Sequence, residues 1–137
     1  MYPDYIVTPM RAELTEAGFE ELRDPAAVET TLTTAEGTTL LVVNSVCGCA
    51  AGAARPGVRL ALQRDKTPDR KVTVFAGVDT DATKKAREFL LPYPPSSPSI
   101  ALFKDGKLVH MIERHHIEGR PAEMIAQNLQ LAFDQYC

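Results

Sequence analysis

The pattern of apolar and polar positions along the chain predicts four β-strands. Residues 38–44 (TTLLVVN) form a continuous β-branched and apolar run, which is typical of a strand buried on both faces in the middle of a sheet. A second strand is expected over residues 71–78 (KVTVFAGV). Residues 99–103 and 108–112 flank an Asp105-Gly106 turn, so they predict an antiparallel hairpin.

Helices are predicted between these strands, mainly from capping residues and from proline at the first helical position. Thr8-Pro9 and Asp24-Pro25 both carry this start signal. An alanine-rich segment follows residue 49, and Pro56-Gly57 should kink it. Together the signals predict helices over residues 9–17, 25–32, 50–63 and 81–91, and from Pro121 to the end of the chain.

The order of these elements predicts an α/β fold. Helices that alternate with strands imply parallel strand pairs, and the closing hairpin adds antiparallel pairs. We therefore expect a mixed sheet of four or five strands with helices on both faces, in one domain over residues 1–137. The fifth strand would be the short segment 5–7. Residues 92–98 (PYPPSSP) contain four prolines and should be irregular.

Composition and charge exclude several classes of function. The chain is 45% hydrophobic and 24% charged, as in an ordinary globular domain. Its formal net charge of −3 argues against a chain-wide basic field for nucleic acid or an anionic membrane. The longest apolar run, residues 40–43, is too short to span a bilayer, and the first residues lack a signal-peptide pattern. We therefore expect a cytoplasmic protein with neither nucleic-acid nor membrane partners.

Two of the three cysteines lie at the junction between the central strand and the next helix. Cys47 and Cys49, separated only by Gly48, follow strand 38–44 almost at once. A sulfur at a helix start faces unpaired N–H groups and the positive end of the helix dipole, which favour the thiolate. Because the thiolate is the nucleophile in disulfide exchange, this placement predicts redox chemistry.

Gly48 is expected to serve the geometry of this pair. A disulfide between residues i and i+2 requires an unusual turn, near the upper limit of the Cα separation that bridged cysteines tolerate. Glycine would remove the Cβ clash that such a turn creates. The bridge between Cys47 and Cys49 should be strained and therefore easily reduced.

Other uses of the cysteines remain open at this point. A metal site needs about four ligands, and the remaining candidate ligands show no ligand spacing to the CGC pair: His110, His115, His116 and Cys137. No metal and no bound cofactor are therefore predicted. A metal-binding protein that uses the CGC thiols stays an alternative, as does a non-catalytic module in which the cysteines are incidental.

Three segments of the chain resemble the bacilliredoxin family within the thioredoxin superfamily. They are residues 44–56 (NSVCGCAAGAARP), 93–99 (YPPSSPS) and 110–120 (HMIERHHIEGR). The match runs along nearly the whole chain, and CGC in place of CxxC is uncommon among thioredoxin relatives. The resemblance implies a thioredoxin-like three-layer sandwich and a cis peptide bond between Ser97 and Pro98.

The resemblance also implies an enzyme that removes bacillithiol from S-bacillithiolated proteins, with bacillithiol as a thiol co-substrate. Cys47 would attack the mixed disulfide and carry bacillithiol, and either Cys49 or a second bacillithiol would clear it. Pro98 would keep metal from the thiols, and the backbone of Ser97 would pair with the substrate. A general disulfide isomerase or oxidoreductase is the nearest alternative.

Two arginines are candidates to bind the malyl carboxylates of bacillithiol. Arg55 follows the CGC segment directly, and Arg114 lies in the third family segment. The predicted substrate-binding residues are thus Gly48, Arg55, Ser97 and Pro98. The charged run 84–88 (KKARE) is interpreted as a solvated helix face.

Overall fold

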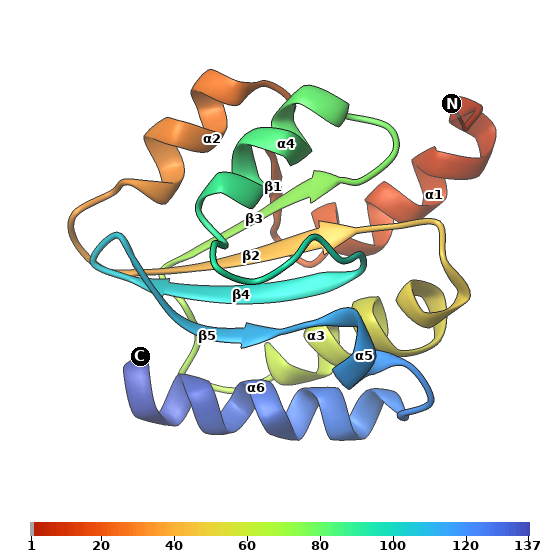
Figure 1. Cartoon of the computed structure of the whole chain (residues 1–137). Coiled ribbons are helices and arrows are strands. Elements are labelled where there is room, and N and C mark those ends of the chain that lie inside the picture. Colours follow the sequence, from red (N-terminus) through yellow and green to blue (C-terminus); the bar gives the residue numbers. More distant parts are fainter. Residues whose placement is uncertain (1) are drawn as a thin grey trace.

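A five-stranded mixed sheet forms the centre of the molecule, with the strand order β1-β3-β2-β4-β5 (Figure 1). The computed structural model describes residues 2–137. The central strand β2 pairs in parallel with β3 and antiparallel with β4, while β1 and β5 form the two edges. The strands are β1 (Glu20–Glu21), β2 (Thr38–Asn44), β3 (Arg70–Phe75), β4 (Ser99–Lys104) and β5 (Lys107–Ile112).

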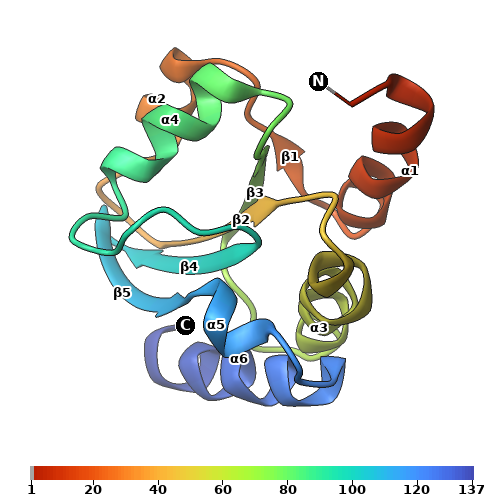
Figure 2. The ribbon, with the colours of Figure 1, turned by 45° about the vertical axis from the view of Figure 1, so that its right-hand side comes forward.

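Helices cover both faces of the sheet, and each face has its own hydrophobic core. On β2, Leu40 and Val42 face the core beneath α1, α3 and α6, whereas Leu41 and Val43 face the core beneath α2 and α4. Figure 2 shows the two layers of helices on opposite sides of the sheet. The helices are α1 (Asp4–Thr15), α2 (Pro25–Leu32), η1 (Ala50–Ala54), α3 (Arg55–Ala61), α4 (Thr80–Glu88), α5 (Arg114–Ile117) and α6 (Ala122–Tyr136). The predicted three-layer α/β sandwich is confirmed.

The N-terminal region differs from the prediction. Helix α1 already begins at Asp4, so residues 5–7 are helical and the fifth strand, which the sequence left open there, lies elsewhere. Val7 and Leu14 lie two turns apart on one helix face and are both buried, which explains the helical choice. The fifth strand is instead β1, two glutamates at the sheet edge. Its brevity and charge are typical of edge strands and gave no pattern to detect.

The helical segment after the CGC sequence continues through Pro56. It contains a π-helical turn, η1, directly before α3. Proline lacks an N–H group and crowds the carbonyl four residues earlier, and a widened turn accommodates both effects. Gly57 then allows α3 to approach α6, because a Cβ atom at this position would lie 2.6 Å from Cβ of Ile125. The irregularity therefore lies over residues 50–54, before the Pro56-Gly57 position at which the sequence predicted a kink, and α3 runs through both residues.

The C-terminal part supplies the predicted hairpin and one short helix that was not predicted. Asp105 and Gly106 both have positive φ, 52° and 80°, as the tight turn between β4 and β5 requires. Helix α5 follows β5 at once and has only four residues. Within residues 2–137, no helix combines the length and the apolar character needed to cross a membrane.

Candidate active site

Cys47 and Cys49 lie where the chain leaves β2 and turns into the helical segment. The two sulfur atoms are 2.7 Å apart, and both cysteines are free and half-buried. The Cys47 N–H donates to the Ser45 hydroxyl at 3.0 Å, and the Cys47 carbonyl accepts from the N–H of Ala50 at 3.0 Å. The first helical turn therefore holds the dithiol at the end of the central strand.

The pKa values of the two thiols are shifted in opposite directions. A hydrogen bond from Cys49 lowers the pKa of Cys47, and the N–H groups of Cys49 and Ala50 and the charge of Arg114 lower it further. Burial raises the pKa of Cys49. The hydrogen bond that Cys49 donates to Cys47, and the negative charge of the Cys47 thiolate, raise it further. The arrangement therefore favours a thiolate at Cys47 beside a thiol at Cys49.

A buried hydrogen-bond network stabilises the segment between β2 and the dithiol. The Arg55 side chain is 1% exposed, and its Nη1 donates to Asn44 Oδ1 at 2.9 Å and to the Ser45 carbonyl at 2.8 Å. Its Nε lies 3.2 Å from Glu13 Oε2, an ion pair without hydrogen-bond alignment. The prediction that Arg55 binds substrate carboxylates is wrong, because its guanidinium is enclosed and occupied by acceptors of the protein. Arg55 instead fixes the chain at Asn44 and Ser45, two to three residues before Cys47.

The loop before β4 lies against the dithiol, and two arginines hold it there. The Ser97–Pro98 peptide bond is cis, as the family resemblance implies, and a second cis bond at Leu91–Pro92 was not predicted. Arg114 Nη1 donates to the Ser97 carbonyl at 3.1 Å. Arg87 Nη1 donates to the Ser96 carbonyl at 3.1 Å.

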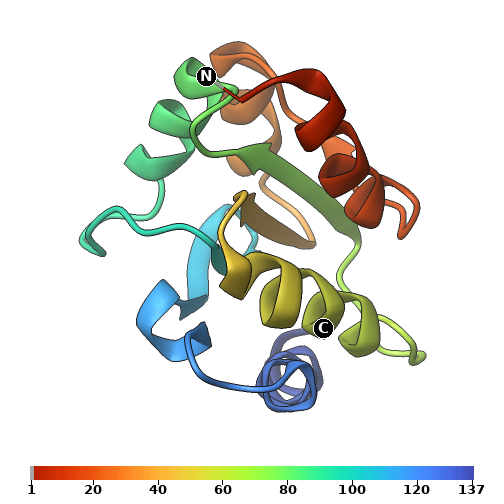
Figure 3. The same ribbon diagram turned by 90° about the vertical axis from the view of Figure 1, so that its right-hand side faces the viewer.

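These groups line one open cavity of about 410 Å³ at the end of the sheet. Its walls include Cys47, Ser97, Arg87 and Arg114. Figure 3 looks onto this end of the molecule, where the segment after β2, the loop before β4 and helix α5 come together. One cavity is therefore lined by the cysteine with the lowered pKa, by Ser97 and by two arginines.

The role predicted for Gly48 concerns the turn of a Cys47–Cys49 disulfide, whereas both cysteines are free here. With the cysteines reduced, Gly48 is exposed, and a Cβ atom there would have no neighbour within 4 Å. Its φ is outside the left-handed region that favours glycine. The expected Cβ clash is therefore absent from this reduced state.

The other candidate residues lie away from the dithiol or do not join it. Among residues 2–137, one group of side chains could together bind a metal ion: Glu113, His115 and His116, on and beside α5. This group contains neither Cys47 nor Cys49. A metal ion bound to these two thiols would therefore lack a third protein ligand among the described residues. Burial raises the pKa of the Cys137 thiol, which lies near Thr38, where β2 begins.

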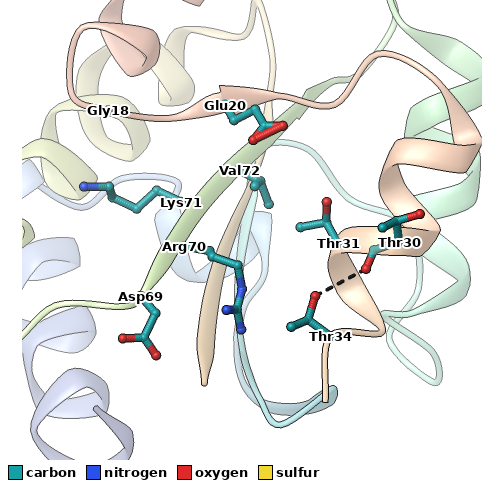
Figure 4. Close-up of a pocket in the computed structure, with 9 residues that line it drawn as sticks. All are labelled: Gly18, Glu20, Thr30, Thr31, Thr34, Asp69, Arg70, Lys71 and Val72. Carbon is teal, nitrogen blue, oxygen red and sulfur yellow. Dashed lines mark hydrogen bonds between the residues drawn. The ribbon is translucent and has the colours of Figure 1, made fainter. Parts of the chain in front are cut away.

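A second cavity, of about 340 Å³, lies near the start of β3 (Figure 4). Its charged residues carry both signs, and Arg70 already donates to Thr39 Oγ1 at 2.9 Å and to the Glu36 carbonyl at 2.6 Å. Figure 4 shows Lys71 extending away from the threonines of α2. This cavity has no cysteine in its lining, so it is separate from the thiol chemistry.

Solved thioredoxins share the fold of this chain. The structure matches thioredoxin from Malassezia sympodialis with a TM-score of 0.60 at 14% identity, covering 86% of this chain and 90% of that one. It matches oxidised thioredoxin O2 from Arabidopsis thaliana with a TM-score of 0.57 at 16% identity, covering 89% and 97%. A family model described as disulphide isomerase matches residues 2–137. The protein is therefore a thiol–disulfide oxidoreductase of the thioredoxin fold.

Its curated relatives define the family more closely. A bacilliredoxin from Cytophaga hutchinsonii is 61% identical, covering 98% of this chain and 99% of that protein. A bacilliredoxin from Halalkalibacterium halodurans is 55% identical, covering 99% and 96%. The chain belongs to the bacilliredoxin family, which confirms the resemblance predicted from the three sequence segments.

Sequence reasoning did not find Arg87, Asn44 or Glu13. The charged run 84–88 indicates a solvated helix face for Arg87, yet Arg87 lies one turn after the buried Thr83 on α4. The four-residue spacing from Thr83 was the sequence signal that Arg87 lies on the partly buried side of α4. Asn44 ends the central strand with a buried polar side chain, and no pattern in the sequence indicates that its partner is Arg55.

Proposed function

We propose that this oxidoreductase removes bacillithiol from mixed disulfides with protein thiols, with Cys47 as the nucleophile and Cys49 as the resolving thiol. One observation supports these roles above all: the two sulfurs are 2.7 Å apart, and their pKa values are shifted in opposite directions. The bacilliredoxin names of the relatives support the choice of substrate.

The first step is an exchange at the mixed disulfide. The Cys47 thiolate attacks the bacillithiol sulfur, so that a bond forms between these two sulfurs and the bond to the protein sulfur breaks. The released protein thiolate then takes a proton from solvent. The bound bacillithiol is thereby transferred to Cys47 with no net change in oxidation state.

The second step clears Cys47. The Cys49 sulfur loses its proton to solvent and attacks the Cys47 sulfur, which forms the Cys47–Cys49 disulfide and releases bacillithiol as a thiolate that is then protonated. Alternatively, a second bacillithiol attacks the bound one, which frees Cys47 and leaves bacillithiol disulfide. If the internal disulfide forms, two equivalents of a thiol reductant restore the dithiol and become a disulfide themselves.

A general disulfide isomerase is the second candidate, because the matching family model carries that description. The same dithiol could attack a disulfide between two protein cysteines. This candidate predicts that the protein reactivates a substrate with scrambled disulfides in the absence of bacillithiol.

The deciding experiment uses the Cys49→Ser variant, whose hydroxyl can still donate to Cys47. Incubated with a bacillithiolated target, this variant should acquire the bacillithiol mass on Cys47 while the target loses it. Cys137→Ser in the same background should behave identically, and Cys47→Ser should acquire nothing. A target that keeps its adduct while Cys47 stays free would exclude the proposed function.

A further inference from the structure

We propose that Arg87, together with Arg114, forms an anion-binding site that recognises the carboxylates of the small thiol carried on Cys47. This inference rests on the proposed function, since bacillithiol carries its carboxylates on a malyl group. It assigns a binding role to the last turn of α4, in the charged run that the sequence indicated as solvated.

The first observation is the environment of Arg87. Its side chain is half-buried, and burial lowers its pKa. It donates to the Ser96 carbonyl, but no carboxylate of residues 2–137 lies within ion-pair distance of it. A partly desolvated cation without a counter-ion is costly, and an anionic ligand would offset that cost.

The second observation is the position of both arginines in the cavity of Cys47. Arg87 and Arg114 line the same 410 Å³ space as the sulfur, and its lining contains no acidic residue. This volume is within the range of about 300–1,000 Å³ that is typical of small-molecule sites. A ligand whose sulfur reaches Cys47 would therefore meet two guanidinium groups in the same cavity.

The third observation is that the two arginines differ in their existing partners. Arg114 pairs with Glu118 and lowers the pKa of Cys47, so its charge already acts on the thiol. Arg87 comes from a different element, α4, and keeps N–H groups beyond its single bond to Ser96. A guanidinium with free donors matches the geometry of a carboxylate, which it binds through two parallel hydrogen bonds.

The test compares an anionic with a neutral thiol on the same peptide. The peptide carries either bacillithiol or 2-mercaptoethanol as a mixed disulfide, and transfer to Cys47 is timed by mass spectrometry in the Cys49→Ser background. Arg87→Gln should slow transfer of bacillithiol by about 10- to 100-fold, the value of a charged hydrogen bond. Transfer of mercaptoethanol should slow much less. Arg87→Lys should restore part of the bacillithiol rate.

Lys84→Gln is the matched control, because it removes one exposed positive charge from the same helix. It should leave both rates at the parent value. Equal slowing of both thiols by Arg87→Gln would overturn the inference, since it would show that Arg87 only holds the loop at Ser96. An unchanged bacillithiol rate would overturn it as well.

A glutathione mixed disulfide separates this inference from the proposed function. If the parent protein accepts no bacillithiol, the proposed function fails. A preference for glutathione over mercaptoethanol that Arg87→Gln abolishes would still support the anion-binding site. If the parent prefers neither anionic thiol to the neutral one, the anion-binding site is excluded.

Discussion

Arg114 Nη1 lies 3.1 Å from the carbonyl oxygen of Ser97, so a side chain from α5 braces the loop that leads into β4. The same guanidinium lowers the pKa of Cys47. One residue of a four-residue helix thus connects the two segments that carry the proposed chemistry, the turn after β2 and the loop before β4.

Replacing Arg114 should therefore weaken the thiolate at Cys47. Arg114→Gln removes a positive charge near the sulfur, so the pKa of Cys47 should rise toward the ordinary thiol value. At pH 6, alkylation of Cys47 should slow about 2- to 5-fold, the range that exposed charge pairs support. Lys107→Gln, which removes an exposed charge from β5, should leave the rate unchanged. An unaltered pH profile in Arg114→Gln would contradict this role.

The three thiols should be alkylated over different pH ranges. Since only the thiolate reacts, the lowered pKa of Cys47 should bring its alkylation midpoint below that of an ordinary thiol. The raised pKa values of Cys49 and Cys137 should move their midpoints above it. Iodoacetamide labelling from pH 5 to 10 at about one-unit steps, read peptide by peptide, measures all three. A common midpoint for Cys47 and Cys137 would refute the prediction.

Cys49 should itself determine part of the Cys47 profile. Its hydrogen bond is the largest cause of the lowered pKa, so Cys49→Ala should raise the Cys47 midpoint more than Cys49→Ser does. The two variants differ in one hydroxyl group, and the same labelling experiment compares them. Equal midpoints would show that this hydrogen bond is not the cause.

Removing Arg55 should destabilise the fold. Arg55→Met keeps much of the side-chain volume but removes the donor to the Ser45 carbonyl. It also removes one of the two hydrogen bonds that Asn44 Oδ1 accepts. The free energy of unfolding in urea should fall by about 1–3 kcal/mol, the cost of buried acceptors left unpaired. Arg59→Met, at an exposed position of the same helix, should change it by less than about 0.5 kcal/mol. Equal stability of the two variants would argue against the network.

The contact between α3 and α6 should not tolerate a side chain at Gly57. Gly57→Ala places a Cβ atom 2.6 Å from Cβ of Ile125 and 3.0 Å from the Ala122 carbonyl oxygen. Overpacking of this kind costs about 1–3 kcal/mol, measured as a loss of unfolding free energy. Gly52→Ala is the control, because a Cβ atom there has no neighbour within 4 Å. It should be neutral or slightly stabilising, and a neutral Gly57→Ala would contradict the close packing.

The sequence alone predicted the secondary-structure elements that have a strong local pattern. The continuous β-branched and apolar run of β2 indicated a strand buried on both faces, and every one of its residues is buried. Asp105-Gly106 indicated the hairpin because few residues adopt positive φ readily. By contrast, β1 consists of two glutamates whose strand conformation comes from pairing with β3, and pairing of this kind leaves no local signal.

The chemistry of the site was predictable where it depends on chain order, and less so where it depends on side-chain direction. The strand–CGC–helix order placed Cys47 at a helix start. The sequence could not indicate that Arg55 turns inward to Asn44 while Arg87 turns toward the dithiol cavity. Both arginines are on helices near the dithiol, and only packing against neighbouring elements decides which of them is enclosed.

Cys137 lies beside the beginning of β2, while the other two thiols follow its end (Figure 1). The seven residues of β2 span about 20 Å, several times the Cα separation of about 4.4–6.8 Å that a disulfide allows. Within one folded molecule, the terminal thiol therefore cannot bridge to either member of the pair. A covalent link between Cys137 and Cys47 would join two separate chains, and a non-reducing gel would show it as a band of doubled mass.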